Sequence, residues 1–223
     1  MTTKIISIVV PCYLIPAGGN IHPENELLHL TERCVNSLRQ HCDAELVIID
    51  NGSITGAEYL SSVADVYYRF STNRGYAAAI NTGFEIASGH WLVACNNDIE
   101  LLDDWPSMAI GAWDHLTGAI SSHLIDHDPQ RLMGRELSGV GSMFGSLWMT
   151  NREIWSVVGK LDDGYGLGMY EDKDYWWRIG QYGLEMAKVG HCRHAGNATW
   201  GKLQYQQEIF LANRARYEGK WGK

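Results

Sequence analysis

Lys4–Pro11 has the sequence KIISIVVP, a nearly continuous run of apolar and mostly β-branched residues that a proline ends. A strand with one face in water alternates apolar and polar residues, whereas a strand covered on both faces is apolar throughout. This segment therefore predicts a buried strand at the centre of a parallel sheet.

The segments after this strand alternate between helix and strand patterns. Apolar residues recur at helical spacing over 27–38, and a second buried strand follows at Ala44–Ile49. This alternation predicts an α/β fold with a mostly parallel central sheet and helices on both faces. We expect the next elements to be a short helix near Gly56–Ala64, a strand at Asp65–Phe70, a helix over Gly75–Ala87 and a strand at His90–Cys95.

Beyond Trp105 the pattern is looser. The chain shows no internal repeat and no long linker, so we expect a single domain over residues 1–223. The expected elements are a helix to about Leu116, a strand near Ala119–His123, a Gly- and Ser-rich strand region at Ser138–Thr150, a helix from Asn151, a helix from Glu171 through Gln181, a strand at Leu184–Val189 and a helix at Tyr205–Trp221.

Charge and composition exclude several classes of protein. Lys and Arg number 18 against 26 Asp and Glu, and the net charge of −8 opposes broad contact with nucleic acid or an anionic membrane. Five cysteines without paired spacing favour reduced thiols in the cytoplasm. We find neither a signal-peptide pattern nor a transmembrane segment. We expect a cytoplasmic protein, with peripheral membrane association and oligomeric state left open.

Polar, turn-forming residues follow each of the first four predicted strands. In an open parallel sheet, ligands bind beyond the carboxyl ends of the strands. The carboxylate of Asp50 can accept a hydrogen bond from a pyrimidine or a ribose, but Asp50 or Ser53 can equally cap the following helix. Asn73 and Gly75 open a helix where a ligand can approach the backbone, although a plain N-cap at Asn73 is equally compatible.

Asn96, Asn97 and Asp98 place a cluster of oxygen donors directly after a buried strand. Mg²⁺ often takes only one or two carboxylates and completes its shell with water and substrate phosphate. One aspartate beside a diphosphate is therefore sufficient for a cation site. The alternative is an ordinary Asx turn.

Glu171, Asp172 and Asp174 form an acidic cluster at the start of a predicted helix. A structural explanation is available, because acids favour a helix N-terminus and Asp174 can pair with Arg178 one turn later. Three neighbouring carboxylates also repel one another, which a nearby cation would relieve. The aromatic residues that follow can raise a carboxyl pKa toward that of a general base.

Two histidines follow the predicted last strand. His191 and His194 stand beside Cys192, and a neutral imidazole there can complete a cation site. A zinc site is the alternative, but a fourth ligand at ordinary zinc spacing is missing.

Several short motifs occur together in a recognisable order, and in this order and spacing they resemble the family 2 inverting glycosyltransferases. The resemblance covers nearly the whole chain, from Ile6 to about Gly201, and extends to the rhamnosyltransferase-like enzymes that transfer a single sugar. The motifs are VVPCY (9–13), VIIDNGS (47–53), NRGYAAAINTG (73–83), ASGHWL (87–92), NND (96–98), VGKLD (158–162), YEDKD (170–174) with Arg178, and HAG from His194.

The resemblance implies the GT-A fold, a Rossmann-like nucleotide-binding fold, with a nucleotide-sugar-binding half at 1–98 and an acceptor and catalytic half at 99–223. It implies an inverting transfer from a nucleoside-diphosphate sugar, with UDP or dTDP favoured, to a hydroxyl on a glycan, lipid-linked glycan or protein. Asp172 would be the base, and Mn²⁺ or Mg²⁺ would be held by Asp98 and His194. Glu171 and Asp174 would orient the acceptor and the Gly-rich loop that precedes them, which contains Gly164, Gly166 and Gly168. The donor-binding residues would be Pro11, Tyr13, Asp50, Asn73, Gly75, Asn81, Asn96 and Asn97.

The sequence departs from the family pattern at one important place. The usual Asp-x-Asp is Asn96-Asn97-Asp98, so one carboxylate is missing and cation affinity is expected to be lower. A sugar nucleotidylyltransferase would need a basic loop after the first strand, and the chain has no Lys or Arg over 12–25. An inactive binding module would be expected to lose Asp98 or Asp172, and both are present. A transferase acting on a DNA base is disfavoured by the net charge.

Overall fold

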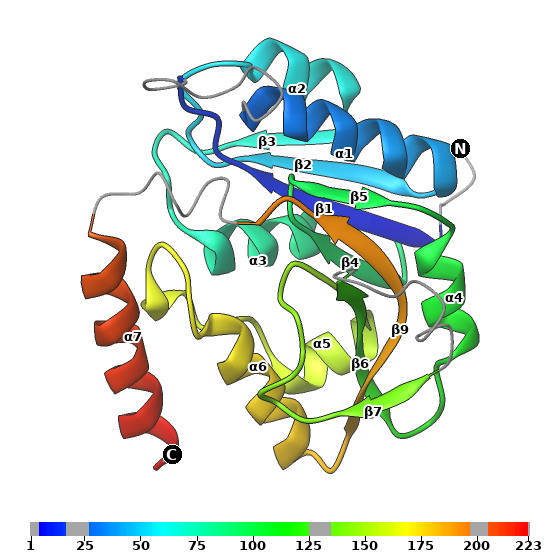
Figure 1. Cartoon of the computed structure of the whole chain (residues 1–223), viewed down its shortest axis with the longest axis vertical. Helices are drawn as coiled ribbons and strands as arrows, with labels where there is room; N and C mark the ends of the chain where they lie inside the picture. The colour runs from blue at the N-terminus through cyan, green and yellow to red at the C-terminus, as the bar shows by residue number, and fades with distance from the viewer. Residues whose placement is uncertain (1–4, 17–26, 125–134, 197–204, 223) are drawn as a thin grey trace.

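The computed structural model describes residues 5–16, 27–124, 135–196 and 205–222. Within these ranges the strands form one nine-stranded sheet in the order β3-β2-β1-β4-β8-β6-β9-β5, with β7 also paired to β9 (Figure 1). The strands are β1 (Ile6–Cys12), β2 (Glu45–Asp50), β3 (Val66–Arg69), β4 (Trp91–Cys95), β5 (Ile99–Leu101), β6 (Thr117–Leu124), β7 (Glu136–Ser138), β8 (Leu147–Asn151) and β9 (Glu185–His194).

The first strand lies where its sequence predicts. β1 pairs in parallel with β2 on one side and with β4 on the other, and β2 pairs in parallel with β3. Val9 and Val10 point to opposite faces of the sheet and both are fully buried. The expectation of a central strand covered on both faces is confirmed, although Lys4 lies outside the described residues.

The predicted α/β fold is confirmed, and its parallel part consists of β1 to β4 together with the β6–β9 pair. Among the described strands, each antiparallel pair includes β5, β7 or β8. The helices are α1 (Leu27–His41), α2 (Ala57–Val63), α3 (Tyr76–Ile86), α4 (Trp105–Gly111), α5 (Arg152–Val158), α6 (Glu171–Gln181) and α7 (Gln206–Trp221), and a 3-10 turn, η2, covers Asp163–Tyr165.

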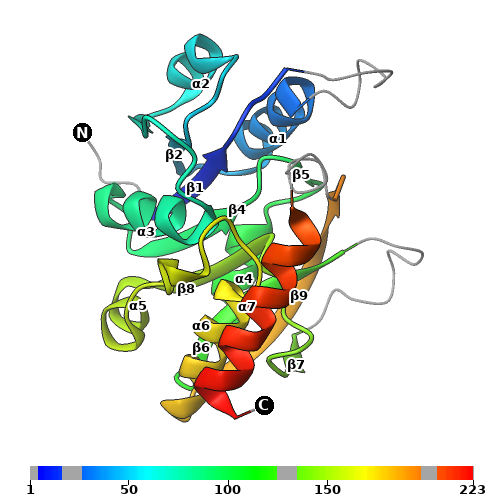
Figure 2. The ribbon, with the colours of Figure 1, turned by 90° about the vertical axis from the view of Figure 1, so that its left-hand side faces the viewer.

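Two hydrophobic layers cover the two faces of the sheet. One layer contains buried residues of α1, α2 and α4, such as Cys34, Leu60 and Trp105. The other contains residues of α3, α5 and α6, such as Phe84 and Trp176. Figure 2 shows α1 and α3 on opposite sides of β1. The predicted helices on both faces are therefore present.

The second half of the chain differs from its predicted elements in detail. β5 was not predicted, and the strand region expected at Ser138–Thr150 is divided into β7 and β8. The last strand does not end at Val189 but continues to His194, because β5 pairs antiparallel with its final residues. This extension brings His194 next to the segment that contains Asp98.

Candidate active site

A pocket of about 650 Å³ opens at the carboxyl ends of β1 and β4, as expected for an open α/β sheet. The side chains that line it come from loops far apart in the sequence and from the end of β9. The lining residues are Pro11, Cys12, Tyr13, Asn51, Asn73, Tyr76, Asn96, Asn97, Asp98, Leu124, Phe144, Gly145, Ser146, Leu167, Gly168, Met169, Glu171, Asp172, His194 and Gly196.

One side of the pocket is formed by the segments after β1, β2 and β3. Pro11, Tyr13 and Asn73 line it, as their positions in the sequence predict. The Oδ1 atom of Asn73 accepts a hydrogen bond of 2.9 Å from the backbone N–H of Gly75. Asn73 therefore shapes the start of α3 and borders the pocket at the same time.

Asn51 is a pocket residue that the sequence analysis did not select. Its Nδ2 donates to the carbonyl oxygen of Gly75, and its Oδ1 accepts from the backbone N–H of Arg74 at 2.8 Å. The signal was its place in the polar turn after β2, directly beside Asp50. Asn51 joins the ends of two parallel strands at the rim of the pocket.

Asp50 lies outside the pocket, which corrects its predicted contact with a nucleoside. Its side chain is 0% exposed. One carboxylate oxygen accepts from the backbone N–H of Ser53 at 2.7 Å, and the other accepts from the Tyr67 hydroxyl at 2.8 Å and lies 3.4 Å from Nε of Arg69. Asp50 therefore closes the turn after β2, and the alternative prediction of a helix cap is also wrong, because the N-cap residue of α2 is Gly56.

Asn81 is also absent from the pocket lining, contrary to its predicted place near the donor. Its Nδ2 donates to the Leu161 carbonyl oxygen at 2.8 Å, and its Oδ1 accepts from the Leu161 N–H at 2.9 Å. Both ends of the amide are therefore used to attach the segment before η2 to α3.

Asp98 and His194 meet in the pocket, with the Nε2 of His194 3.0 Å from Oδ1 of Asp98. The β5–β9 ladder produces this approach, because Ile99 pairs with His194 and Ala195 donates a backbone hydrogen bond to the carbonyl oxygen of Asp98. Neighbouring ligands of an octahedral cation at roughly 2.1 Å lie about 3 Å apart. The two side chains are therefore spaced as adjacent ligands of one divalent cation.

Asn96 offers a further oxygen in the pocket that this pair lines. Its Oδ1 is buried without a hydrogen-bond partner, and the residue lines the pocket. Asn97 also lines the pocket, but its Nδ2 donates to the Thr31 hydroxyl at 2.8 Å. The described residues contain no cluster of three or more His, Cys, Asp or Glu side chains. The donor set thus fits a cation that keeps water and a ligand phosphate, and it does not support zinc.

The other side of the pocket contains two of the three predicted acids. Glu171 and Asp172 begin α6 and line the pocket, and Asp172 lies against the backbone of Gly145. Burial raises the pKa of Asp172, although the backbone N–H of Lys173 donates to its Oδ1 at 2.7 Å and partly offsets this rise. Burial, with the charge of Asp172, raises the pKa of Glu171 to about 8. Glu171 can therefore hold a proton near neutral pH beside Asp172.

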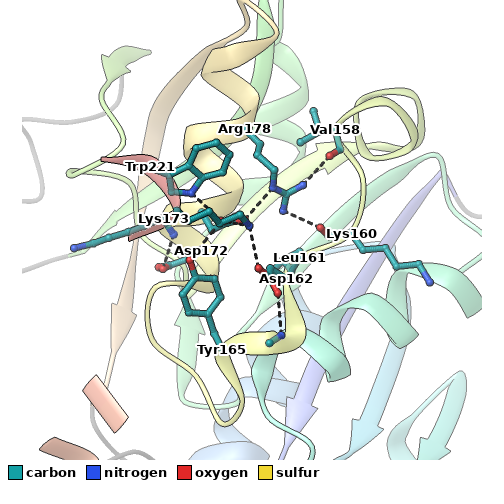
Figure 3. A network of polar contacts seen from close by, with 12 residues as sticks. Val158, Lys160, Leu161, Asp162, Tyr165, Asp172, Lys173, Arg178 and Trp221 are labelled. Atoms are coloured by element: carbon teal, nitrogen blue, oxygen red, sulfur yellow. Dashed lines mark hydrogen bonds and ion pairs between the residues drawn. The ribbon is translucent and has the colours of Figure 1, made fainter. Parts of the chain in front are cut away.

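Asp174 does not line the pocket, which corrects its predicted place among the catalytic residues, but it accepts a hydrogen bond of 3.4 Å from the Tyr165 hydroxyl of the Gly-rich loop, as its predicted contact with that loop requires. Its carboxylate is fully buried and bonded to the Arg178 guanidinium, the Lys220 ammonium and the indole N–H of Trp221. The expected pairing with Arg178 is confirmed at 2.9 Å. Figure 3 shows Arg178 continuing to the carbonyl oxygens of Val158 and Lys160. Asp174 therefore links α6 to α7 through polar contacts outside the pocket.

Glu171→Gln is expected to stabilise the protein at pH 8 by roughly 1–3 kcal/mol and to leave its stability at pH 4.5 nearly unchanged. The folded pKa of about 8 is above the ordinary value of 4.5, so wild-type stability is complete below pH 4.5 and declines as the pH rises toward 8. Glutamine resembles the protonated acid and removes this decline. Urea unfolding at both pH values measures it, with the exposed Glu153→Gln as a control. Equal pH dependence in Glu171→Gln and wild type would contradict the assignment.

Gly75→Ala is expected to destabilise the fold by roughly 2–4 kcal/mol. Gly75 has φ +87°, and a Cβ there would overlap the carbonyl oxygen of Gly166. Gly166 itself has open space at its own Cβ position, although it too has a positive φ of +66°. The excess loss of Gly75→Ala over Gly166→Ala in urea unfolding therefore measures the overlap. Equal losses would show that the loop moves away freely.

The fold and the site together define a class of protein. The pocket lies at the strand ends of an α/β sheet and contains an Asp–His pair spaced like two cation ligands and a pair of acids that can be protonated. This arrangement is expected of a GT-A glycosyltransferase. The family model described as glycosyl transferase family 2 matches residues 7–152. The chain belongs to this family.

Solved structures support the fold assignment. The mannosyltransferase PcManGT from Pyrobaculum calidifontis, in complex with GDP-Man and Mn²⁺, matches with a TM-score of 0.66 and 17% identity over 96% of this chain and 61% of that one. GalNAc-T7 with UDP, GalNAc and Mn²⁺ matches with a TM-score of 0.74 and 17% identity over 99% and 49%. This chain thus spans about half to three fifths of those proteins. No curated protein sequence matches it.

Proposed function

We propose that this protein transfers one sugar from a nucleoside-diphosphate sugar to a hydroxyl acceptor, with inversion at the anomeric carbon and with Mn²⁺ or Mg²⁺ as cofactor. The observation that carries the proposal is that the Asp98–His194 pair and the Glu171–Asp172 pair line the same pocket. Membership of family 2 and the likeness to GT-A structures support it.

Asp98, His194 and the free Oδ1 of Asn96 would hold the cation. A divalent cation bound there supplies positive charge that stabilises a leaving diphosphate. Pro11, Tyr13, Asn51 and Asn73 would contact the nucleoside from the opposite strand ends. The donor would therefore lie across the carboxyl ends of β1 and β4, with its sugar directed toward α6.

Asp172 would act as the general base on the acceptor side. It takes the proton of the acceptor hydroxyl, the hydroxyl oxygen bonds to the anomeric carbon, and the bond from that carbon to the diphosphate oxygen breaks. A raised pKa suits this task, because a stronger base removes the proton more readily. Glu171 would orient the acceptor through a hydrogen bond, since its Oε2 has no partner in the described structure.

We extend the proposal to the features that the sequence resemblance implies. These are a UDP or dTDP donor, single-sugar transfer of the rhamnosyltransferase-like kind, an acceptor on a glycan, lipid-linked glycan or protein, and donor and acceptor halves that meet near residue 98. The unpaired cysteine pattern adds a cytoplasmic location to the proposal. In the described part of the chain, no helix is long and apolar enough to cross a membrane.

The pocket disfavours the two alternative functions. An inactive binding module would lack its reactive groups, whereas Asp98 and Asp172 both line the cavity. A nucleotidylyltransferase needs cations from the protein to hold a triphosphate, and the described lining of this pocket contains neither lysine nor arginine.

A thermal-shift panel with UDP, dTDP, GDP and CDP, each with and without Mn²⁺, tests the proposal. A nucleotide that binds only the folded state at 100 times its Kd stabilises it by about 2.7 kcal/mol. We expect one nucleotide to raise the melting temperature by several degrees only when Mn²⁺ is present. No shift with any of the four at millimolar concentration would overturn the proposal.

A further inference from the structure

The C-terminal helix α7 lies against the Gly-rich loop, residues 162–170, which leads into α6 (Figures 1 and 2). Only two of its described side chains, Asn213 and Tyr217, are buried. The ring of Tyr217 lies 5.5 Å from that of Tyr170, at the end of the loop. Because α7 buries little apolar surface, its attachment depends mainly on particular polar and aromatic contacts.

Asn213 attaches α7 to two points of the loop with one amide group. Its Nδ2 donates to the carbonyl oxygens of Tyr165 and Gly168, each at 2.7 Å. Gly168 lines the pocket, together with its neighbours Leu167 and Met169. The contact therefore reaches the pocket wall from behind, without Asn213 itself touching the cavity.

The opposite side of the loop contacts the donor side of the pocket. The backbone N–H of Tyr76, in the first turn of α3, donates to the carbonyl oxygen of Leu167. Met169 and Tyr170 have φ of 74° and 76°, a conformation that side chains rarely adopt. Such strained residues persist only where the surroundings hold them. In this loop the surroundings are α3 on one side and α7 on the other.

Ion pairs hold the base of the same loop to α7. The Lys220 ammonium and the Arg216 guanidinium both donate to Asp162, at 2.9 and 3.1 Å. Burial opposes the charge on Asp162, but these hydrogen bonds outweigh it and lower its pKa to about 2. The indole N–H of Trp221 in α7 and the hydroxyl of Tyr165 in the loop both donate to Oδ1 of Asp174. The loop is thus attached to α7 along its length.

We propose that α7 holds one wall of the pocket in place, and that Asn213 is a positioning residue that keeps the Gly-rich loop in its substrate-binding conformation. The inference rests on the proposed function for the identity of the substrate, a sugar nucleotide. If Asn213 loses its two donors, the open fraction of the loop grows, and the apparent Kd rises as the inverse of the closed fraction, because only the closed loop binds.

Asn213→Asp and Asn213→Ala test this proposal in the intact chain. Aspartate keeps the size of the side chain but removes both donors, and alanine removes the side chain. Arg214→Ala is the matched control, because Arg214 is exposed on the same helix and pairs only locally with Glu218 in the described structure. Two measurements are made: hydrogen exchange of peptides from 163–170 without ligand, and the Kd of the nucleotide that shifts the wild type.

We expect both Asn213 variants to exchange roughly 30-fold faster in the loop, since two buried hydrogen bonds contribute about 2 kcal/mol and 1.4 kcal/mol is tenfold. Nucleotide binding should weaken by a smaller factor, because the Kd rises only as the closed fraction of the loop falls. Peptides from β1 and β4 should exchange at the wild-type rate, and Arg214→Ala should match the wild type. In steady-state kinetics KM should rise while kcat changes much less.

Loop exchange in the Asn213 variants equal to that of Arg214→Ala would overturn this proposal. Faster exchange spread through β1 and β4 would also overturn it, because Asn213 would then stabilise the whole fold rather than the loop. If the wild type binds no nucleotide, the proposed function fails, while the exchange comparison still decides whether Asn213 holds the loop.

Discussion

Asp172→Asn is expected to lower kcat by roughly 10²–10⁴-fold, the usual contribution of a general base, and to leave nucleotide binding within about twofold of the wild type. Asparagine fills the same volume beside Gly145 but cannot take a proton from the acceptor. Release of nucleoside diphosphate measures kcat, and the thermal shift with Mn²⁺ measures binding. The two readouts separate a chemical defect from a lost site.

Asp163→Asn is the matched control for this prediction. Asp163 is an exposed acid of the Gly-rich loop that does not line the pocket. It should retain nearly full kcat. If Asp172→Asn kept more than a tenth of the wild-type rate, Asp172 would not be the base, and Glu171 would be the next residue to test.

The period of the α-helix explains why the side chains of Asp172 and Asp174 point in different directions. Residues two apart in an α-helix differ by about 200° around the axis, so they face nearly opposite directions. Asp172 faces the pocket, and Asp174 faces Arg178 and α7. Which of the two faces points to the pocket depends on how α6 packs on the sheet, through Trp176 and Ile179. That packing is a long-range property that the local pattern does not contain.

A strand covered on both faces is apolar throughout, as the run 4–11 nearly is, so the buried strands were predictable. Asp50 was not, because its partners Tyr67 and Arg69 come from β3. The parallel register places Arg69 opposite Asp50, and an arginine at that position leaves the carboxylate bonded inside the protein. The choice between a ligand contact and a structural role was therefore decided by a neighbouring strand.

β5 was missed because its three residues are too few to show a period. Its pairing with β9 is nevertheless what places His194 beside Asp98. Asn51 and Asn213 were missed for a related reason, since each acts by bonding backbone atoms of a distant loop. Such residues are identified from the backbone atoms that they bond, which the residue type alone does not indicate.

Asp98→Ala is expected to abolish the Mn²⁺-dependent thermal shift and to reduce kcat/KM by roughly 10³-fold. Asp98 supplies the charged ligand of the proposed cation pair, and a bound cation contributes several kcal/mol to the stabilisation of a leaving group. Asp98 is also the single carboxylate of the Asn96-Asn97-Asp98 segment, so no neighbouring acid can replace it. Its side chain is nearly buried. Melting curves with nucleotide at increasing Mn²⁺ concentration measure the loss.

His194→Ala should have a smaller effect than Asp98→Ala, because a neutral imidazole contributes a ligand but no charge. We expect it to weaken the Mn²⁺ dependence without removing it, so that higher Mn²⁺ restores the thermal shift in His194→Ala and not in Asp98→Ala. This ordering tests the geometry, since a cation held elsewhere in the pocket would leave both variants with the same Mn²⁺ titration as the wild type. Equal and complete loss in both would instead show that the imidazole and the carboxylate act as one unit, with His194 orienting Asp98 across their 3.0 Å contact.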